Sequence, residues 1–198
     1  MADHYFTEKP TSDITTEEFE ISVRGTRLFF TTPSGVFSYG RADKASSLLV
    51  ECAEVPEKAK VLDFGCAWGF IGIAIKKSIP SVDMTMIDVN ERALKFAERN
   101  ARRNRVDVKI IKSDLFQSIK GKFDEIIVNP PMKAGREICY KIIEDSVKYL
   151  EKNGTLQLVA LHNRGGAMLE KKMNDVFGNV ETIAKKSGFR VYLSRLQI

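Results

Sequence analysis

The sequence predicts an α/β fold built on a doubly wound, mostly parallel sheet of seven strands. From Lys60 onward, short apolar segments alternate with amphipathic ones, a pattern typical of βαβ units. The chain ends on two consecutive β-prone segments, which predict an antiparallel strand at one edge of the sheet. Its 198 residues, 43% of them hydrophobic, suit a single domain with a full core.

Residues 1–44 are expected to form a small N-terminal β-hairpin followed by a loop, and residues 45–198 to form the core. Gly25 lies between two β-prone runs, where it supplies the positive φ of a hairpin turn. Asp43 precedes a helical segment and is expected to cap it. The two strands, the loop and the helix are expected at residues 19–23, 27–30, 31–40 and 45–53.

The elements of the core follow one another in the order that the alternation predicts. Short apolar runs predict the strands, and longer amphipathic segments predict the helices. Ser187 and Gly188 join the last two strands. The strands are expected at residues 60–64, 83–87, 107–111, 123–128, 155–160, 180–185 and 189–193, and the helices at 69–78, 91–104, 136–150 and 166–176.

Composition excludes several classes of protein. No apolar run approaches the roughly 18 residues of a membrane span, and the N-terminus lacks the pattern of a secretory signal, so we expect a cytoplasmic protein without a membrane partner. The three cysteines are odd in number and far apart, which argues against a disulfide framework or a metal site. The formal charge of +5 mildly favours a polyanionic partner.

A strand-to-helix turn with small residues follows the first core strand. The strand carries Asp63, and Gly65, Ala67 and Gly69 occupy alternate positions after it. Such a turn lets a ligand approach the backbone closely. Asp63 would repel a pyrophosphate and attract a cationic ligand such as a sulfonium amino acid. Ala67 is expected to fit the turn only with a negative φ.

Two more acids follow strands of the predicted sheet. Asp88 ends the second strand, where its carboxylate can accept bonds from both hydroxyls of an adenosine ribose. It could instead cap the next helix, a role for which Asn90 is also available. Asp114 follows the third strand and could accept a hydrogen bond from an adenine amino group, although aspartate is also common in turns.

The turn Asn129-Pro130-Pro131-Met132 is the most specific motif in the chain. It directly follows an apolar strand, and its prolines fix φ and remove backbone donors, which leaves acceptors. An exocyclic amine could donate to the Asn129 oxygen and to the Pro130 carbonyl, which would aim its lone pair at a sulfonium methyl group. The alternative is a structural turn without chemistry.

Together these residues resemble the class I S-adenosylmethionine methyltransferases, which have a Rossmann-like fold. More narrowly, the chain resembles the small-domain type, typified by the guanine-N2 methyltransferases of small-subunit ribosomal RNA. The resemblance implies S-adenosylmethionine as cofactor and S-adenosylhomocysteine as product, with Asn129, Pro130 and Pro131 as the catalytic turn. It implies cofactor contacts by Phe37, Asp63, Gly65, Ala67, Gly69, Asp88, Asp114, Leu115 and Asn129.

The same resemblance suggests where a substrate would lie. Met132 stands where relatives usually carry an aromatic residue that stacks on the base, and a thioether stacks less specifically. Lys133 and Arg136, beside the catalytic turn, are placed for a substrate phosphate. Residues 162–164 could reach the same cleft. A cluster of arginines could contact RNA or only be solvated near a helix end; it comprises Arg99, Arg102, Arg103 and Arg105.

Three functions are compatible with these observations. The first is methylation of the exocyclic amine of guanine in ribosomal or other structured RNA. The second uses the same chemistry on a glutamine side chain of a protein. The third is a partner-dependent or non-catalytic module that binds S-adenosylmethionine. The sequence leaves the oligomeric state open.

Overall fold

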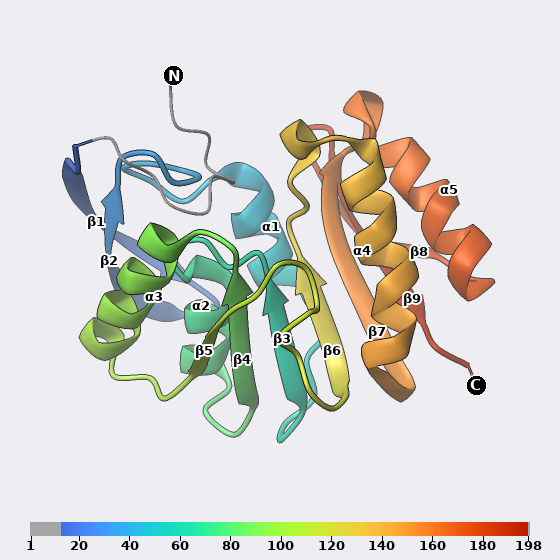
Figure 1. Cartoon of the computed structure of the whole chain (residues 1–198), viewed down its shortest axis with the longest axis horizontal. Helices are drawn as coiled ribbons and strands as arrows, with labels where there is room; N and C mark the ends of the chain where they lie inside the picture. Colours follow the sequence, from blue (N-terminus) through green and yellow to red (C-terminus); the bar gives the residue numbers. More distant parts are fainter. Residues whose placement is uncertain (1–12, 198) are drawn as a thin grey trace.

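The computed structural model describes residues 13–197 and has the expected α/β architecture (Figure 1). The N-terminal residues, on which the expectation of no secretory signal rests, lie outside that range. Seven strands form the main sheet in the order β5-β4-β3-β6-β7-β9-β8, and β1 and β2 form a separate antiparallel hairpin. Among the described residues, none of the helices has the length and apolarity needed to cross a membrane.

The bounds of the elements agree closely with the predicted ranges. The strands are β1 Thr16–Val23, β2 Thr26–Pro33, β3 Lys60–Phe64, β4 Asp83–Asp88, β5 Lys109–Lys112, β6 Phe123–Val128, β7 Leu150–Leu161, β8 Glu181–Lys186 and β9 Phe189–Arg195. The helices are α1 Lys44–Cys52, α2 Phe70–Ser78, α3 Glu91–Asn104, α4 Arg136–Tyr149 and α5 Gly166–Phe177. Two short 3₁₀ helices, η1 Met132–Ala134 and η2 His162–Arg164, were not expected.

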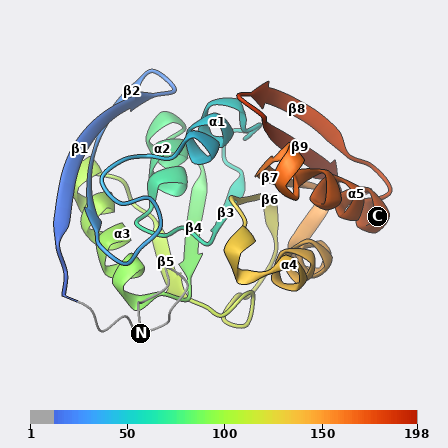
Figure 2. The same cartoon turned by 90° about the horizontal axis from the view of Figure 1, so that it is seen from above.

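The sheet is covered on both faces, as in a doubly wound fold. Helices α1, α2 and α3 lie on one face and α4 and α5 on the other (Figures 1 and 2). Strands β3 to β7 are parallel, and β9 is antiparallel to both of its neighbours. The antiparallel strand predicted at the edge is therefore β9, which lies one place inside the edge strand β8.

The hairpin lies along the outside of α3 (Figure 2) and is held there by two asparagine amides. Asn100 accepts from the backbone N–H of Thr31 at 2.9 Å and donates to its carbonyl at 3.0 Å. Asn104, one turn later, makes the same pair of bonds with Phe29, at 2.9 and 2.7 Å. Both side chains therefore take the place of a third strand, and their amides satisfy backbone hydrogen-bonding groups on the inner edge of β2.

The largest difference from the predicted ranges is the length of β7. It begins at Leu150 and not at Thr155, although Asn153 has the left-handed φ of 64° that is typical of a turn. The register between β6 and β7 shifts between Phe123 and Glu125, so an irregularity accommodates the extra residues. Asn153 keeps its turn conformation within this irregularity, where its N–H donates to the carbonyl of Leu196 at 2.9 Å.

Candidate functional site

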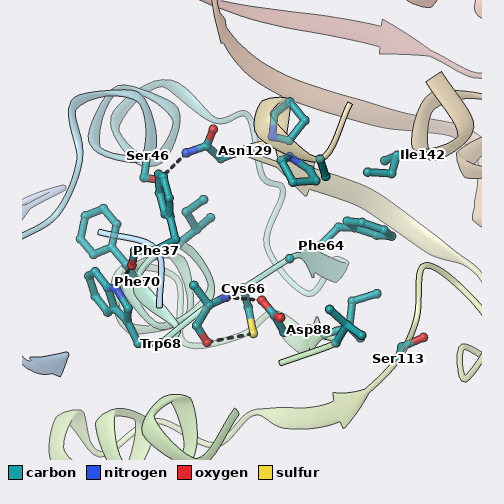
Figure 3. A pocket seen from close by; sticks show the side chains of 18 of the residues that line it. Phe37, Ser46, Phe64, Cys66, Trp68, Phe70, Asp88, Ser113, Asn129 and Ile142 are labelled. Carbon is teal, nitrogen blue, oxygen red and sulfur yellow. Dashed lines mark hydrogen bonds between the residues drawn. The ribbon is translucent and has the colours of Figure 1, made fainter. Parts of the chain in front are cut away.

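A cavity of about 350 Å³ opens at the carboxyl ends of the central strands (Figure 3). Strand β3 pairs with β4 on one side and with β6 on the other, and open α/β sheets bind ligands at such a switch in strand order. Of the residues singled out from the sequence, Phe37, Gly65, Ala67, Asp88, Asp114, Leu115, Asn129, Pro130 and Pro131 line the cavity. Asp63, Gly69, Met132, Lys133 and Arg136 do not line it.

The turn after β3 leaves open space beside its backbone. Gly65 has a φ of 71°, and a Cβ added to it would meet no heavy atom within 4 Å. Gly69 caps α2 with a φ of 94°, but it lies behind the cavity, where an added Cβ would come within 2.8 Å of Ile73. Gly65 therefore leaves room for the predicted approach of a ligand, and Gly69 allows close packing of α2.

The expectation of a negative φ at Ala67 is wrong. Ala67 has a φ of 48°, in the left-handed region that costs a residue with a Cβ roughly 1–2 kcal/mol. Its backbone N–H donates to Oδ2 of Asp88 at 2.8 Å, and this bond ties the turn to the end of β4. The turn thus keeps the left-handed conformation that a glycine at this position would adopt without strain.

Asp88 organises the ribose side of the predicted cofactor site. Besides the bond from Ala67, its Oδ1 accepts from the N–H of Asn90 at 2.9 Å. Burial raises the pKa of Asp88, and the backbone hydrogen bonds act against that rise. Asn90 caps α3 by accepting from Ala93, so Asp88 is not needed as the helix cap. Asp88 also lines the cavity, where ribose hydroxyls could donate to its remaining lone pairs.

Asp63 lies beneath the turn and is fully buried. Its Oδ2 accepts from the N–H of Gly72 at 2.8 Å, while its Oδ1 has no partner among the described residues. Burial raises the pKa of Asp63 to about 7, helped by the neighbouring Asp88 and opposed by the bond from Gly72. A role for Asp63 in binding a cationic ligand stays a prediction.

This buried carboxyl predicts a specific dependence of stability on pH. Because the pKa of Asp63 is raised from 3.8 to about 7, the folded protein holds the proton more tightly than the unfolded chain. The free energy of unfolding should therefore fall by up to about 4 kcal/mol as pH rises from about 4 to about 7. Asp63→Asn, which keeps an acceptor for Gly72, should lack this contribution in urea unfolding measured across that range.

The comparison with wild type isolates Asp63 from other groups. Burial also raises the pKa of Glu125 to about 7, and that carboxyl contributes equally to both proteins. Parallel stability profiles for wild type and Asp63→Asn would show that Asp63 does not titrate in this range.

The adenine end of the predicted site lies after β5. Asp114 is exposed at the cavity wall, with its Oδ2 accepting from Gln117 at 3.2 Å. Leu115 has a φ of 50°, and its carbonyl accepts from the Ser113 hydroxyl at 2.7 Å. Ile87 provides an apolar wall nearby. This combination of one exposed acceptor and apolar side chains suits a planar base.

The loop after β2 covers the opposite side of the cavity. Trp68 donates from Nε1 to the carbonyl of Phe37 at 2.7 Å, which ties this loop to the turn after β3. Trp68 both lines the cavity and packs in an aromatic cluster, with ring centroids 5.0 Å from Phe30 and 5.7 Å from Phe70. The position and packing of Phe37 therefore depend on the hairpin.

The predicted catalytic turn follows β6 at the mouth of the cavity. Nδ2 of Asn129 donates to the Ser46 hydroxyl at 2.9 Å and lies 3.5 Å from Oδ1 of Asp43 (Figure 3). No described residue donates to Oδ1 of Asn129, so that oxygen can accept from a ligand. The Pro130 carbonyl already accepts from the N–H of Met132 at 2.8 Å, so the expected acceptor there keeps one free lone pair.

Asp43 and Ser46 are functional candidates that the sequence patterns did not reveal. Asp43 was expected only as a helix cap, and it does cap α1 by accepting from Ala45 and Ser46. Ser46 is buried on the same side of α1 as Leu49 and Val50. A serine on the buried face of a helix must find a hydrogen-bond partner, and this signal could have identified it.

Ser46→Ala should slow methyl transfer without weakening cofactor binding. The substitution removes the 2.9 Å bond to Asn129 and leaves only the longer approach to Asp43. We expect kcat to fall about 5- to 10-fold, because this corresponds to the free energy that one hydrogen bond contributes. The Kd for S-adenosylmethionine should be unchanged. Ser47→Ala, which loses only a bond to the Asp43 carbonyl, is the matched control. Equal kcat values for the two variants would contradict this role.

The predicted substrate residues do not line the cavity. Met132 packs against Cys139, with the sulfur atoms 3.9 Å apart, and a Cβ on Gly165 would lie 2.5 Å from its Cε. Arg136 lies over the ring of Tyr140 and approaches the sulfur of Met168. Lys133 is exposed next to the lining residues of the turn. A substrate role for these three residues stays a prediction.

Other expectations from the sequence concern the cysteines and His162. Cys52, Cys66 and Cys139 are free, and the described residues contain no group of side chains suited to a metal ion. His162 lies 2.8 Å from the Tyr192 hydroxyl and does not line the cavity.

Comparison with known proteins gives an independent view of this chain. The model of the methyltransferase small domain family matches residues 27–193. The uncharacterized protein YbxB of Bacillus subtilis is 34% identical and covers 96% of this chain and 97% of its own length. Ribosomal RNA small subunit methyltransferase C of Pasteurella multocida is 35% identical over 81% of this chain but only 49% of its own.

A solved structure has the same fold over almost the whole chain. The 16S rRNA N2 methyltransferase RsmC of T. thermophilus, in complex with AdoMet and guanosine, superimposes with a TM-score of 0.82 at 20% identity. The match covers 95% of this chain and 52% of that one. The chain thus spans about half the length of the ribosomal RNA methyltransferases that it matches.

Proposed function

Because this chain belongs to the methyltransferase small domain family, we propose that it methylates the exocyclic amine of guanine in ribosomal or other structured RNA. Its family and relatives make it an S-adenosylmethionine-dependent methyltransferase. The relatives named as ribosomal RNA methyltransferases and the net charge of +5 support an RNA acceptor.

The orientation of Asn129 is the observation that carries this proposal. Its amide nitrogen is bound by Ser46 and Asp43, so its oxygen remains as the acceptor for an incoming amine. An amine donor fits this acceptor, and the second lone pair of the Pro130 carbonyl can take the other N–H. Neither group is a strong base, which suits a nitrogen whose proton becomes acidic only as it is alkylated.

The cavity also fits the cofactor. Open space beside Gly65, the acceptors of Asp88 and Asp114, and the apolar wall at Ile87 and Leu115 match an amino acid, a ribose and a planar base in turn. When bound, S-adenosylmethionine supplies an electrophilic methyl group and leaves as S-adenosylhomocysteine.

The chain itself contributes orientation and desolvation. Asn129 and Pro130 would hold both N–H groups of the acceptor, which would orient the nitrogen lone pair toward the methyl group that the cofactor supplies. The amine proton then leaves to solvent. Because Phe37 and Trp68 wall the same cavity, water is kept from one side of the reacting atoms.

Transfer of labelled methyl groups tests the proposed function. Undermodified total RNA, intact ribosomal subunits and total protein are each incubated with the enzyme and labelled S-adenosylmethionine. Label in RNA, located at N2 of guanine by nucleoside analysis, is the expected result.

Other outcomes would replace the proposal. Label only in protein would favour glutamine as the acceptor. Cofactor binding without label in any acceptor would favour a partner-dependent or non-catalytic module.

A further inference from the structure

Exposed cations surround one half of the cavity mouth. They come from four separate segments, and we call them the cationic arc: Lys44, Lys133, Arg164 and Lys186. Each is exposed, and none forms an ion pair with another described residue. Lys44 is the first residue of α1, where the helix dipole disfavours a positive charge, so helix stability does not account for it.

Contacts between the loops show that the cationic arc is continuous with the cavity. Lys133 lies between Pro131 and Ala134, which line the cavity. The next loop touches this turn, because a Cβ on Gly165 would lie 2.5 Å from Met132.

The turn between β8 and β9 is the next segment in this series of contacts. The N–H of His162 donates to the carbonyl of Gly188 at 3.0 Å, so this turn, which Lys186 precedes, lies beside η2. Lys44 follows the lining residue Asp43, whose Oδ1 lies 3.5 Å from Nδ2 of Asn129, so the start of α1 lies beside the same turn.

The other half of the mouth has the opposite character. Asp88 and Asp114 line the cavity there. Lys112 forms an ion pair with Glu91 at 2.8 Å.

The arginine-rich helix α3 is also engaged within the protein. Arg103 and Arg99 both contact Glu18 of the hairpin, at 2.7 and 3.7 Å. These two arginines therefore attach the hairpin to α3, and their charge is partly neutralised. Lys95 and Arg102 of α3 are exposed and form no ion pair with a described residue, but no residue of α3 lines the cavity. The cationic arc lies instead on the side of β6, β7 and β8.

We propose that the cationic arc binds the phosphate backbone of the RNA whose guanine enters the cavity. This inference rests on the proposed function and assigns the backbone to the β6–β7–β8 side, not to α3. Phosphates are attracted to the unpaired cations of the arc and repelled by the exposed carboxylate of Asp114, so charge favours this orientation of the strand. The cavity lies at the bottom of the mouth, so the target base must be unpaired or turned out of its helix to enter.

Two double variants with the same loss of charge test the cationic arc. Arg164→Gln/Lys186→Gln removes two of its cations, and Lys95→Gln/Arg102→Gln removes two exposed cations of α3. Binding of a fluorescein-labelled RNA hairpin with an unpaired guanine in its loop is measured by anisotropy, with S-adenosylhomocysteine present and at several salt concentrations. Thermal unfolding and calorimetric binding of S-adenosylhomocysteine confirm that both variants are folded.

The two variants should differ in affinity and in salt dependence. Loss of two phosphate contacts should raise the Kd of the first variant about 10-fold or more and lower the slope of log K against log salt by about 1.4. The α3 variant should bind within about twofold of wild type. Equal losses in both variants, or none in the first, would overturn the proposal.

Failure of the inference can be told apart from failure of the proposed function. Wild type that methylates RNA, together with an Arg164→Gln/Lys186→Gln variant that binds it normally, would overturn the cationic arc alone. Wild type that neither binds the hairpin nor labels any RNA would overturn both.

Discussion

Asn129→Ala should abolish most of the methyl transfer while leaving the fold intact. The side chain is half-buried at the cavity mouth and is held by Ser46 at 2.9 Å, so its oxygen is a preoriented acceptor for the developing positive charge on nitrogen. Loss of one preorganised group of this kind typically lowers kcat about 10²- to 10³-fold. The fall in rate is measured by single-turnover kinetics, with labelled S-adenosylmethionine and the acceptor that takes up the label.

Measurements of cofactor binding and a matched asparagine variant distinguish a loss of catalysis from a loss of structure. The Kd for S-adenosylmethionine should change only a few-fold, because one of several cavity contacts is lost. Asn163→Ala replaces an exposed asparagine in η2 and should retain wild-type kcat. If Asn129→Ala kept more than about a tenth of wild-type kcat, the turn after β6 would not be the catalytic centre.

Asn100→Ala should cause a large loss of stability. Asn100 is fully buried, and its amide bonds the N–H and the carbonyl of Thr31 as well as the carbonyl of Trp68, the last at 2.9 Å. Alanine leaves three backbone groups without partners, at about 1–3 kcal/mol each. We expect the free energy of unfolding to fall by about 3–5 kcal/mol, measured by urea denaturation.

Two further asparagines test the reason for that loss. Asn174→Ala changes an exposed position of α5 and should be nearly neutral. Asn104→Ala also detaches β2 from α3, but its side chain does not contact Trp68. Only Asn100→Ala should therefore also weaken S-adenosylmethionine binding, through the turn after β3. Equal Kd values for the two variants would refute the link between the hairpin and the cofactor turn.

Local patterns in the sequence predicted most of the secondary structure. The alternation after Lys60 predicts each strand and helix of the core, because burial imposes different periods on strands and helices. Asp43 and Asn90 act as helix caps, the first as expected and the second as the alternative to Asp88. The family resemblance, drawn from the acids and the proline turn, is confirmed by the match over residues 27–193.

The same patterns predicted the backbone conformation of individual residues less well. Ala67 adopts a left-handed φ because the bond from its N–H to Asp88 holds the turn. Asn153 resembles a loop residue, yet it lies within β7. Ala67 thus departs from its local preference, whereas Asn153 keeps a left-handed φ of 64° and lies where the register of β7 shifts.

The residue pattern alone predicts the fold class, the methyltransferase family and the position of Asn129 after a central strand. Three-dimensional packing was needed to show that Ser46, 83 residues away, holds the Asn129 amide, and that Asn100 connects Thr31 with Trp68. It also paired Arg103 with Glu18, 85 residues apart, and left the cationic arc unpaired. Strand and helix periods are local properties of the chain, whereas the partner of a polar side chain depends on which distant segment the strand order brings beside it.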